Sequence, residues 1–228
     1  MKLTLRAPLP DARAWSAIGA AIALIAALEA LPGVDHRSTA IGLTAALVLI
    51  GTSVTAGLAS DRRRRWDEWT VGRRQCSPGN AFVATLVGFS CAALCGLVVS
   101  MFKSAWILDA KSLVAGVLLG SAFAAALGAL LGLTAHARHE LNHRSLMTFC
   151  VLLAPVAMGC GDNLPGPVCR VVRWWPTVAL NDLLFAAFAK QSDGSTAVSA
   201  AIELLLAISL ILAVAFRFAP RWQVKLTS

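Results

Sequence analysis

The amino-acid sequence predicts an all-α integral membrane protein with six transmembrane helices. The 228 residues are 57% hydrophobic and 14% charged, whereas a soluble domain typically has about 25% charged residues. The hydrophobic residues also gather in runs of 17 or more, the length that a helix needs to cross a hydrocarbon core of roughly 30 Å. We therefore expect residues 1–228 to form one multi-pass transmembrane domain.

Six runs are long enough to span a bilayer. The fifth is short and contains Pro155, and it is the least regular of them. Alanine and glycine are frequent in the runs, as in "ALGALLG", which is typical of helices that pack closely against other helices. In chain order the predicted spans are Trp15–Leu31, Ala40–Leu58, Ala81–Phe102, Leu113–Ala135, Ser145–Gly161 and Ala197–Phe216.

The distribution of basic residues predicts that both termini are cytoplasmic. With the N-terminus inside, fourteen of the 20 lysines and arginines lie on the cytoplasmic side and six lie outside, in agreement with the positive-inside rule. This orientation suits a protein of the plasma membrane. It also accounts for the net charge of +8 without a nucleic-acid partner, because the basic block lies next to the bilayer and no base-reading module accompanies it.

The most charged segment, residues 60–79, connects the second and third predicted spans. Asp61 can cap a helix, and no Gly or Pro interrupts "RRRRWDEWTV", so we expect a short cytoplasmic helix here. Trp66 and Trp69 lie three residues apart and therefore on one side of it. Because Trp favours the headgroup region and Arg pairs with anionic lipid, the helix is either a membrane anchor or a docking element for a soluble partner.

The segment between the fifth and sixth spans, residues 162–191, is expected on the outer side. Within it "PTVALNDLLFAAFA" is apolar but only 14 residues long, with Asn181 and Asp182 in the middle. This length and polarity predict a re-entrant or interfacial helix rather than a span, with Pro176 in its first turn. Cys160 and Cys169 flank "GDNLPGPV" and either form a disulfide or remain free.

Three stretches together resemble the permease subunit of a type-2 ABC exporter, the small six-span kind whose ATPase is a separate chain. They are "DRRRRWDEWTVGRRQCSPGNAFVATLVG", "LLGLTAHARHELNHRSLMTFCVLL" and "VVRWWPTVALNDLL". The resemblance extends from about Trp15 to Arg217. It implies a chain that forms a substrate pathway and relies on a partner for ATP hydrolysis.

The resemblance also implies partners and functional residues. Two copies of a cytoplasmic ABC ATPase would hold ATP and Mg²⁺, because this chain has no G-x-x-x-x-G-K-[ST] loop and is expected to carry no cofactor of its own. Two permease chains, identical or homologous, would enclose the pathway. The ATPase-coupling residues would be Arg62, Arg65, Trp66, Asp67, Glu68 and Trp69. For the pathway or outer gate we expect Pro176, Asn181, Asp182 and Glu203, the last being a carboxylate within a span.

A second interpretation belongs to another class of protein. The sequence "HELNH", from His139 to His143, matches H-E-x-x-H, in which two histidines bind zinc and the glutamate acts as a general base. An intramembrane metalloprotease would carry this motif within a span. Here the motif is expected in a polar link after the fourth span, and no third ligand follows at the usual spacing. His139, Glu140 and His143 are accordingly kept only as an alternative metal site, beside the permease interpretation.

Overall fold

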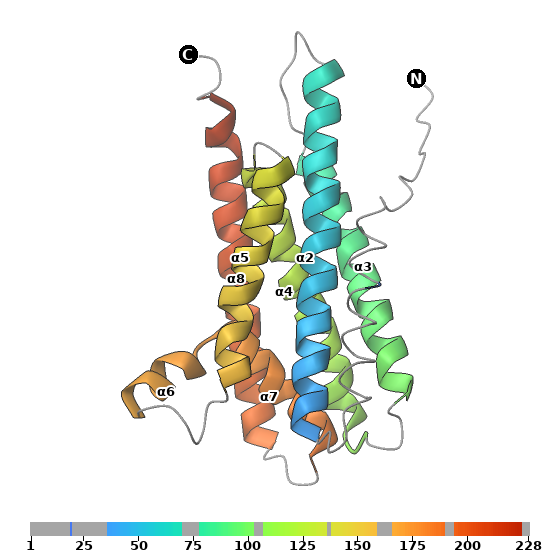
Figure 1. Cartoon of the computed structure of the whole chain (residues 1–228), viewed down its shortest axis with the longest axis vertical. Helices are drawn as coiled ribbons and strands as arrows, with labels where there is room; N and C mark the ends of the chain where they lie inside the picture. Colours follow the sequence, from blue (N-terminus) through green and yellow to red (C-terminus); the bar gives the residue numbers. More distant parts are fainter. Residues whose placement is uncertain are drawn as a thin grey trace.

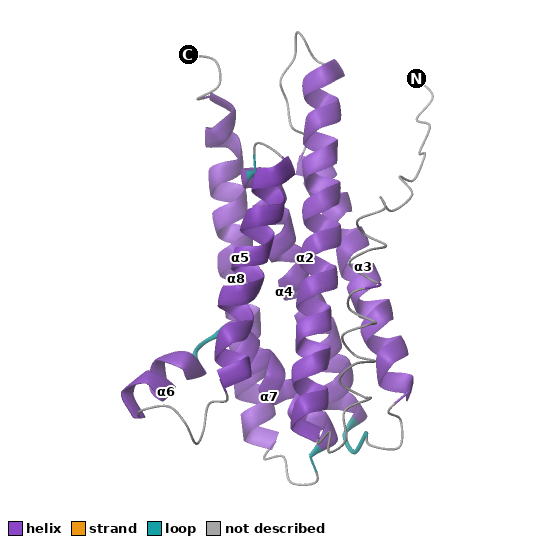
Figure 2. Cartoon of the chain, in the orientation of Figure 1, coloured by secondary structure: helices purple, strands orange, loops and turns teal. Residues whose placement is uncertain are grey.

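The computed structural model describes residues 19, 36–69, 78–102, 107–135, 138–158, 166–189 and 194–224. The elements in these ranges are all helices (Figure 2). The first predicted span, Trp15–Leu31, lies outside the described residues except for Gly19. The five remaining predicted spans each correspond to a helix.

Five of the helices are long and apolar enough to cross a membrane, so the chain is that of a membrane protein. They are α2 (His36–Trp69), α3 (Pro78–Phe102), α4 (Ala110–Thr134), α5 (Arg138–Met158) and α8 (Gly194–Val224). Two short helices, α6 (Gly166–Arg173) and α7 (Pro176–Phe188), connect α5 to α8. Within the segment 162–191, where a re-entrant or interfacial helix was predicted, the structure has these two short helices, and Pro176 lies in the first turn of the second, as predicted.

The predicted end of the second span and the predicted start of the fifth are both wrong. The segment after Leu58 does not start a separate helix, because α2 continues without a break to Trp69. The "HELNH" sequence is not a polar link, because α5 already begins at Arg138. In both segments the sequence has no Gly or Pro that would end or exclude a helix, so the helix extends beyond the apolar residues that face the membrane.

Helix α4 is the centre of the bundle and packs against α2, α3, α5, α7 and α8 (Figure 1). Small residues recur every fourth position along it, and this spacing places them on one face. They are Gly116, Gly120, Ala124, Gly128 and Gly132. We refer to this set as the α4 small-residue stripe.

The C-terminal half of the stripe lies directly against α2. A Cβ atom added at Gly128 would lie 2.6 Å from the backbone oxygen of Thr52, and one added at Gly132 would lie 2.7 Å from the Cβ of Ala59. Since real Cβ atoms do not approach other atoms so closely, only hydrogen fits at these positions. The two backbones therefore meet at a distance that glycine alone permits, as in other tightly packed membrane helices.

The N-terminal half of the stripe accommodates α7. A Cβ atom at Gly116 or Gly120 would lie 2.7 or 2.8 Å from the side chain of Leu184 or Leu180, respectively, and both leucines are fully buried. The backbone N–H groups of Leu108 and Asp109 donate hydrogen bonds of 2.9 and 3.1 Å to the carbonyl oxygen of Ala187. Helix α7 is consequently a core helix of the bundle.

The outer faces of the bundle are apolar. Helices α5 and α8 expose most of their membrane-length segments, while α2 and α4 bury most of theirs. Large hydrophobic side chains such as Leu146, Val151, Leu206 and Leu210 are exposed on these outer helices. Because apolar surface of this extent is stable in lipid and not in water, the exposed faces are those that contact the bilayer or another apolar surface.

The α2–α4 contact leads to a test of packing. Gly128→Ala should destabilise the protein by about 1–3 kcal/mol, because the new methyl group meets a backbone carbonyl that cannot turn away. Gly57→Ala is the matched control, since a Cβ at Gly57 has nothing within 4 Å, and it should leave stability unchanged or slightly raised. Thermal unfolding in detergent measures both. Equal melting temperatures for the two variants would contradict the close contact.

Candidate functional site

Polar and charged side chains gather where α7 packs against its neighbours, in a bundle that is otherwise apolar. Arg37 lies in the first turn of α2, Arg173 ends α6, and Glu203 lies on α8. All three interact electrostatically with Asp182 of α7. Two polar residues of the same segment complete the set: Asn181, next to Asp182 on α7, and Trp175, directly before that helix. The set comprises Arg37, Arg173, Trp175, Asn181, Asp182 and Glu203. It is referred to below as the α7 polar cluster.

Asp182 is the central acid of the cluster. It lies half-buried on a helix whose neighbouring residues, Leu180, Leu183 and Leu184, are buried completely or nearly so. Burial raises the pKa of the Asp182 carboxyl, Glu203 adds to the rise, and Arg173 and Arg37 oppose it. The carboxyl therefore takes up a proton more readily than an ordinary aspartate, while two guanidinium groups remain near enough to interact with its charged form.

Two polar atoms of the cluster are buried without a hydrogen-bond partner among the described residues. They are the Nε1 of Trp175 and the Oδ1 of Asn181. A buried donor or acceptor without a partner costs about 1–3 kcal/mol. Among the described residues, these two atoms are therefore a donor and an acceptor that no other protein group satisfies.

The position of α7 is fixed from two sides. The hydroxyl of Thr177 in its first turn donates a hydrogen bond to the backbone carbonyl of Leu152 in α5. At its other end Ala187 accepts the two backbone hydrogen bonds from the loop before α4. The Asn181 and Asp182 pair lies between these attachments, so the cluster is held on a helix that is anchored at both ends.

The structure brings together some of the residues that the sequence suggested. Asp182 and Glu203 are 21 positions apart in the chain, yet they interact electrostatically across the α7–α8 contact. The sequence did not suggest Arg37 and Arg173 as members, because they were counted only as charges outside the membrane. For Arg173 the only available signal was its position just before a short helix that contains a carboxylate, and for Arg37 the sequence offered none.

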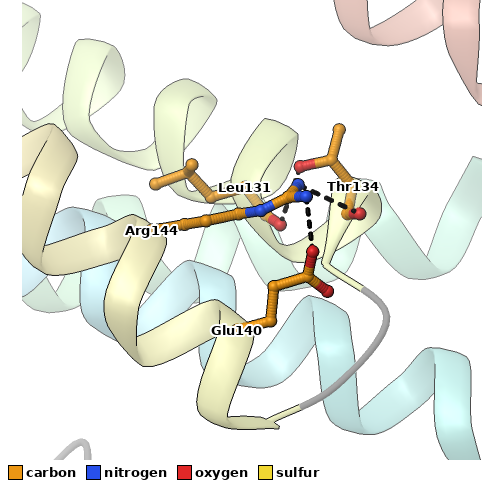
Figure 3. A network of polar contacts seen from close by, with 4 residues as sticks. All are labelled: Leu131, Thr134, Glu140 and Arg144. Atoms are coloured by element: carbon orange, nitrogen blue, oxygen red, sulfur yellow. Dashed lines mark hydrogen bonds and ion pairs between the residues drawn. The ribbon is translucent and has the colours of Figure 1, made fainter.

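A second polar arrangement lies at the α4–α5 junction (Figure 3). A guanidinium nitrogen of Arg144 is 2.5 Å from the Oε1 of Glu140, four residues earlier on α5. The other terminal nitrogen of Arg144 donates a hydrogen bond of 3.4 Å to the backbone oxygen of Thr134. The Thr134 hydroxyl in turn donates to the carbonyl of Leu131 at 3.1 Å. Arg144 therefore satisfies a carbonyl at the end of α4, where basic side chains are favourable.

This junction contains the residues of the alternative zinc motif. Glu140 is engaged by Arg144, and His143 is exposed; the side chain of His139 lies outside the described residues. Across the described ranges, no group of three or more His, Cys, Asp or Glu residues could hold a metal ion. The glutamate of the motif thus has a role in the structure that does not involve metal.

The remaining predicted residues fall partly outside the description. The backbone of residues 62–69 is helical and continuous with α2, but the side chains of the predicted coupling residues are not described. Cys160 lies outside the described residues, and Cys169 lies on α6 without a described side chain. The Cys160–Cys169 disulfide and the coupling surface therefore stay predictions.

Comparisons with known proteins identify no relative of this chain. No protein-family model, curated protein sequence or solved structure matches it.

The α7 polar cluster predicts a pH dependence of stability. An acid whose pKa is raised in the folded state destabilises the fold as pH rises from its unfolded to its folded pKa. The melting temperature of the wild-type protein in detergent should therefore fall as pH rises through that interval, and Asp182→Asn should abolish this fall. Parallel melting curves against pH for the two proteins would contradict a buried carboxyl.

Asp109 provides the opposite case in the same protein. Its carboxyl accepts hydrogen bonds from the Ser112 hydroxyl at 2.5 Å and from the Lys111 backbone N–H at 3.0 Å, and the bond from Ser112 is the main reason that the pKa of Asp109 is lowered. Stability from this group is present above the unfolded pKa and is lost as pH falls through the folded one. The wild-type protein should therefore lose stability as the pH becomes acidic, and Asp109→Asn should abolish that pH-dependent loss.

At the α4–α5 junction, we expect Arg144→Gln to destabilise the protein more than Glu140→Gln. Glu140→Gln removes an ion pair that is partly exposed, which should cost about 0.3–0.5 kcal/mol. Arg144→Gln removes the same pair and also the hydrogen bond to the end of α4, so it should cost about 0.5–1.5 kcal/mol. Thermal unfolding of the two variants measures both costs. A larger effect for Glu140→Gln would contradict the capping role of Arg144.

Proposed function

We propose that this chain is the permease subunit of an ATP-driven ABC exporter in the plasma membrane. The observation that supports this most strongly is α7, a helix of 13 residues that is too short to span a bilayer and yet is buried among the membrane helices α2, α4 and α8. Short helices that pack within a membrane bundle without crossing it occur in transport proteins, where they contact other helices or line a cavity.

The α7 polar cluster supplies the chemistry that a gate at this end of a pathway needs. Its acids and its amide lie on the largely apolar helices α7 and α8, and its indole N–H lies directly before α7. Intramembrane polar groups commonly mark substrate or ion routes. In the proposed orientation the cluster belongs to the outer side of the membrane. Amphipathic substrates would leave the pathway there, since the surrounding Ala, Leu, Gly and Val side chains tolerate many apolar shapes.

The C-terminal part of α2 supports the proposed ATPase contact. The segment extends past the ends of α4 and α5 in Figure 1. The residues that α2 presents to the stripe, such as Thr52 and Ala59, face Gly128 and Gly132 close to the end of α4 at Thr134. At the same helical spacing the α4-facing positions continue to Trp66, beyond the last residue of α4. A cytoplasmic ATPase is the partner proposed to bind this continuation.

A second permease chain would complete the pathway. The exposed apolar faces of α5 and α8 are surfaces that can contact either lipid or another copy of the chain. In the proposed assembly two permease chains, identical or homologous, pack together and two ATPase subunits bind on their cytoplasmic side. The ATPase pair holds the ATP and Mg²⁺, and this chain transmits the closure of that pair to α2 and α3.

The ATPase contact can be tested through the acids of the charged segment. Asp67→Asn with Glu68→Gln should weaken co-purification of the ATPase and lower substrate-stimulated ATP hydrolysis. The reason is that losing an acid at a protein contact leaves a basic group of the partner unpaired, at a cost of about 1–3 kcal/mol. A helix that only anchors the protein to anionic lipid would not be weakened, since the acids oppose that binding.

A second double variant, at His139 and Glu140, tests the alternative that the chain is a zinc enzyme. His139→Ala with Glu140→Ala should leave efflux near the wild-type level, whereas a zinc enzyme would lose all activity because the metal loses a ligand and the water its base. Correct insertion of every variant is checked by its yield in the membrane fraction. Coupling that persists in the Asp67 and Glu68 variant, and also in Trp66→Ala with Trp69→Ala, would reject the ATPase contact.

A further inference from the structure

Helix α6 differs from every other described helix in its position. It extends from the side of the bundle and lies across the long axis, level with the lower end of α5 (Figure 1). Its main contacts are with α7, the next helix in the chain. Helix α5 ends at this height (Figure 1), so α6 lies toward one end of the membrane-length helices, where the hydrocarbon core of a bilayer gives way to the headgroups.

The residues of α6 are segregated into two faces. The sequence "GPVCRVVR" makes this helix strongly amphipathic. Val171 is 69% exposed, and Trp174, directly after the helix, is 75% exposed. Arg173 is two positions from Val171 and therefore on the opposite side of the helix. Arg170 occupies the helical position one turn before Arg173, so the basic positions share one face.

This pattern fits a membrane interface better than water. A valine and a tryptophan that are mostly exposed would be unfavourable in water, but both are favourable in the interfacial layer, where Trp is enriched. Arginines on the opposite face can reach phosphate groups at the same depth. An amphipathic helix with these two faces, lying across the spans at their ends, has the geometry of an interfacial membrane helix.

We propose that α6 is an interfacial helix that binds anionic lipid, with Val171 toward the acyl chains and Arg173 at the lipid phosphates. The occupant of this surface is the bilayer itself. Because Arg173 also interacts with Asp182, a lipid phosphate at Arg173 would compete for the same guanidinium and so link lipid composition to the α7 polar cluster. This inference is independent of whether the chain transports a substrate.

The first test measures the depth of each face in the full-length protein. Single cysteines at position 171 or 173 are introduced in a chain whose native cysteines are replaced, and each is labelled with an environment-sensitive fluorophore in phosphatidylcholine–phosphatidylglycerol vesicles. The label at 171 should emit at shorter wavelength and be quenched by nitroxide-labelled lipid. The label at 173 should be quenched by aqueous iodide. Iodide quenching at both positions, without nitroxide quenching, would overturn the proposal.

The second test uses the native cysteines and so does not depend on the replaced background. The melting temperature of the wild-type protein should rise with the fraction of phosphatidylglycerol in the vesicles. Arg173→Gln should raise the fraction needed for half of this rise by about fivefold, the factor expected for one arginine near an anionic surface. Arg173→Lys retains the charge and should restore the wild-type dependence.

A final comparison removes the contribution of Asp182. Arg173→Gln is repeated in a protein that also carries Asp182→Asn, where the arginine no longer has that carboxylate as a partner. The dependence on phosphatidylglycerol should again weaken about fivefold. An unchanged lipid dependence in this pair would mean that Arg173 acts on Asp182 alone, and it would overturn the lipid-binding role of α6.

Discussion

The close contact between α2 and α4 determines how the rest of the bundle is arranged. Gly128 and Gly132 let the two backbones approach to a distance that no Cβ could occupy. In a membrane there is little hydrophobic force between helices, so packing at this distance is a main source of their attraction. The same stripe continues to Gly116 and Gly120, where the space left by missing side chains receives Leu184 and Leu180 of α7. One row of small residues thus positions both a spanning helix and a short one.

The position of α7 explains why charged groups occur inside an apolar bundle. A helix that does not span the membrane has ends that must be satisfied within the protein, and here Thr177 and Ala187 provide these attachments. Between them Asp182 lies near charged residues from α2, α6 and α8. Helices α2, α6, α7 and α8 therefore each contribute a charged group to one region. Because Gly116 and Gly120 of α4 make room for Leu184 and Leu180, they also fix where α7 holds Asp182.

The sequence predicts the features that depend on local composition. Apolar length identifies the helices α2, α3, α4, α5 and α8, and Pro176 identifies the start of α7. Prediction from the sequence fails where a residue's role depends on neighbours that are close in space and distant in the chain. Nothing local shows that Arg144 caps α4, or that Arg37 and Arg173 interact with Asp182. The charged residues after Leu58 suggested a new helix, because a change of polarity is easily taken for a change of structure, whereas the backbone responds mainly to Gly and Pro.

The continuity of α2 has a mechanical consequence. Its 34 residues rise about 51 Å at about 1.5 Å per residue, well beyond a hydrocarbon core of roughly 30 Å. The last of its close contacts with α4 is Ala59 against Gly132, which leaves a lever arm of about 15 Å to Trp69. A tilt of about 10° around this contact would displace the backbone at Trp69 by about 3 Å. A change in the packing at the end of the glycine stripe would therefore be transmitted to the part of α2 that extends beyond α4.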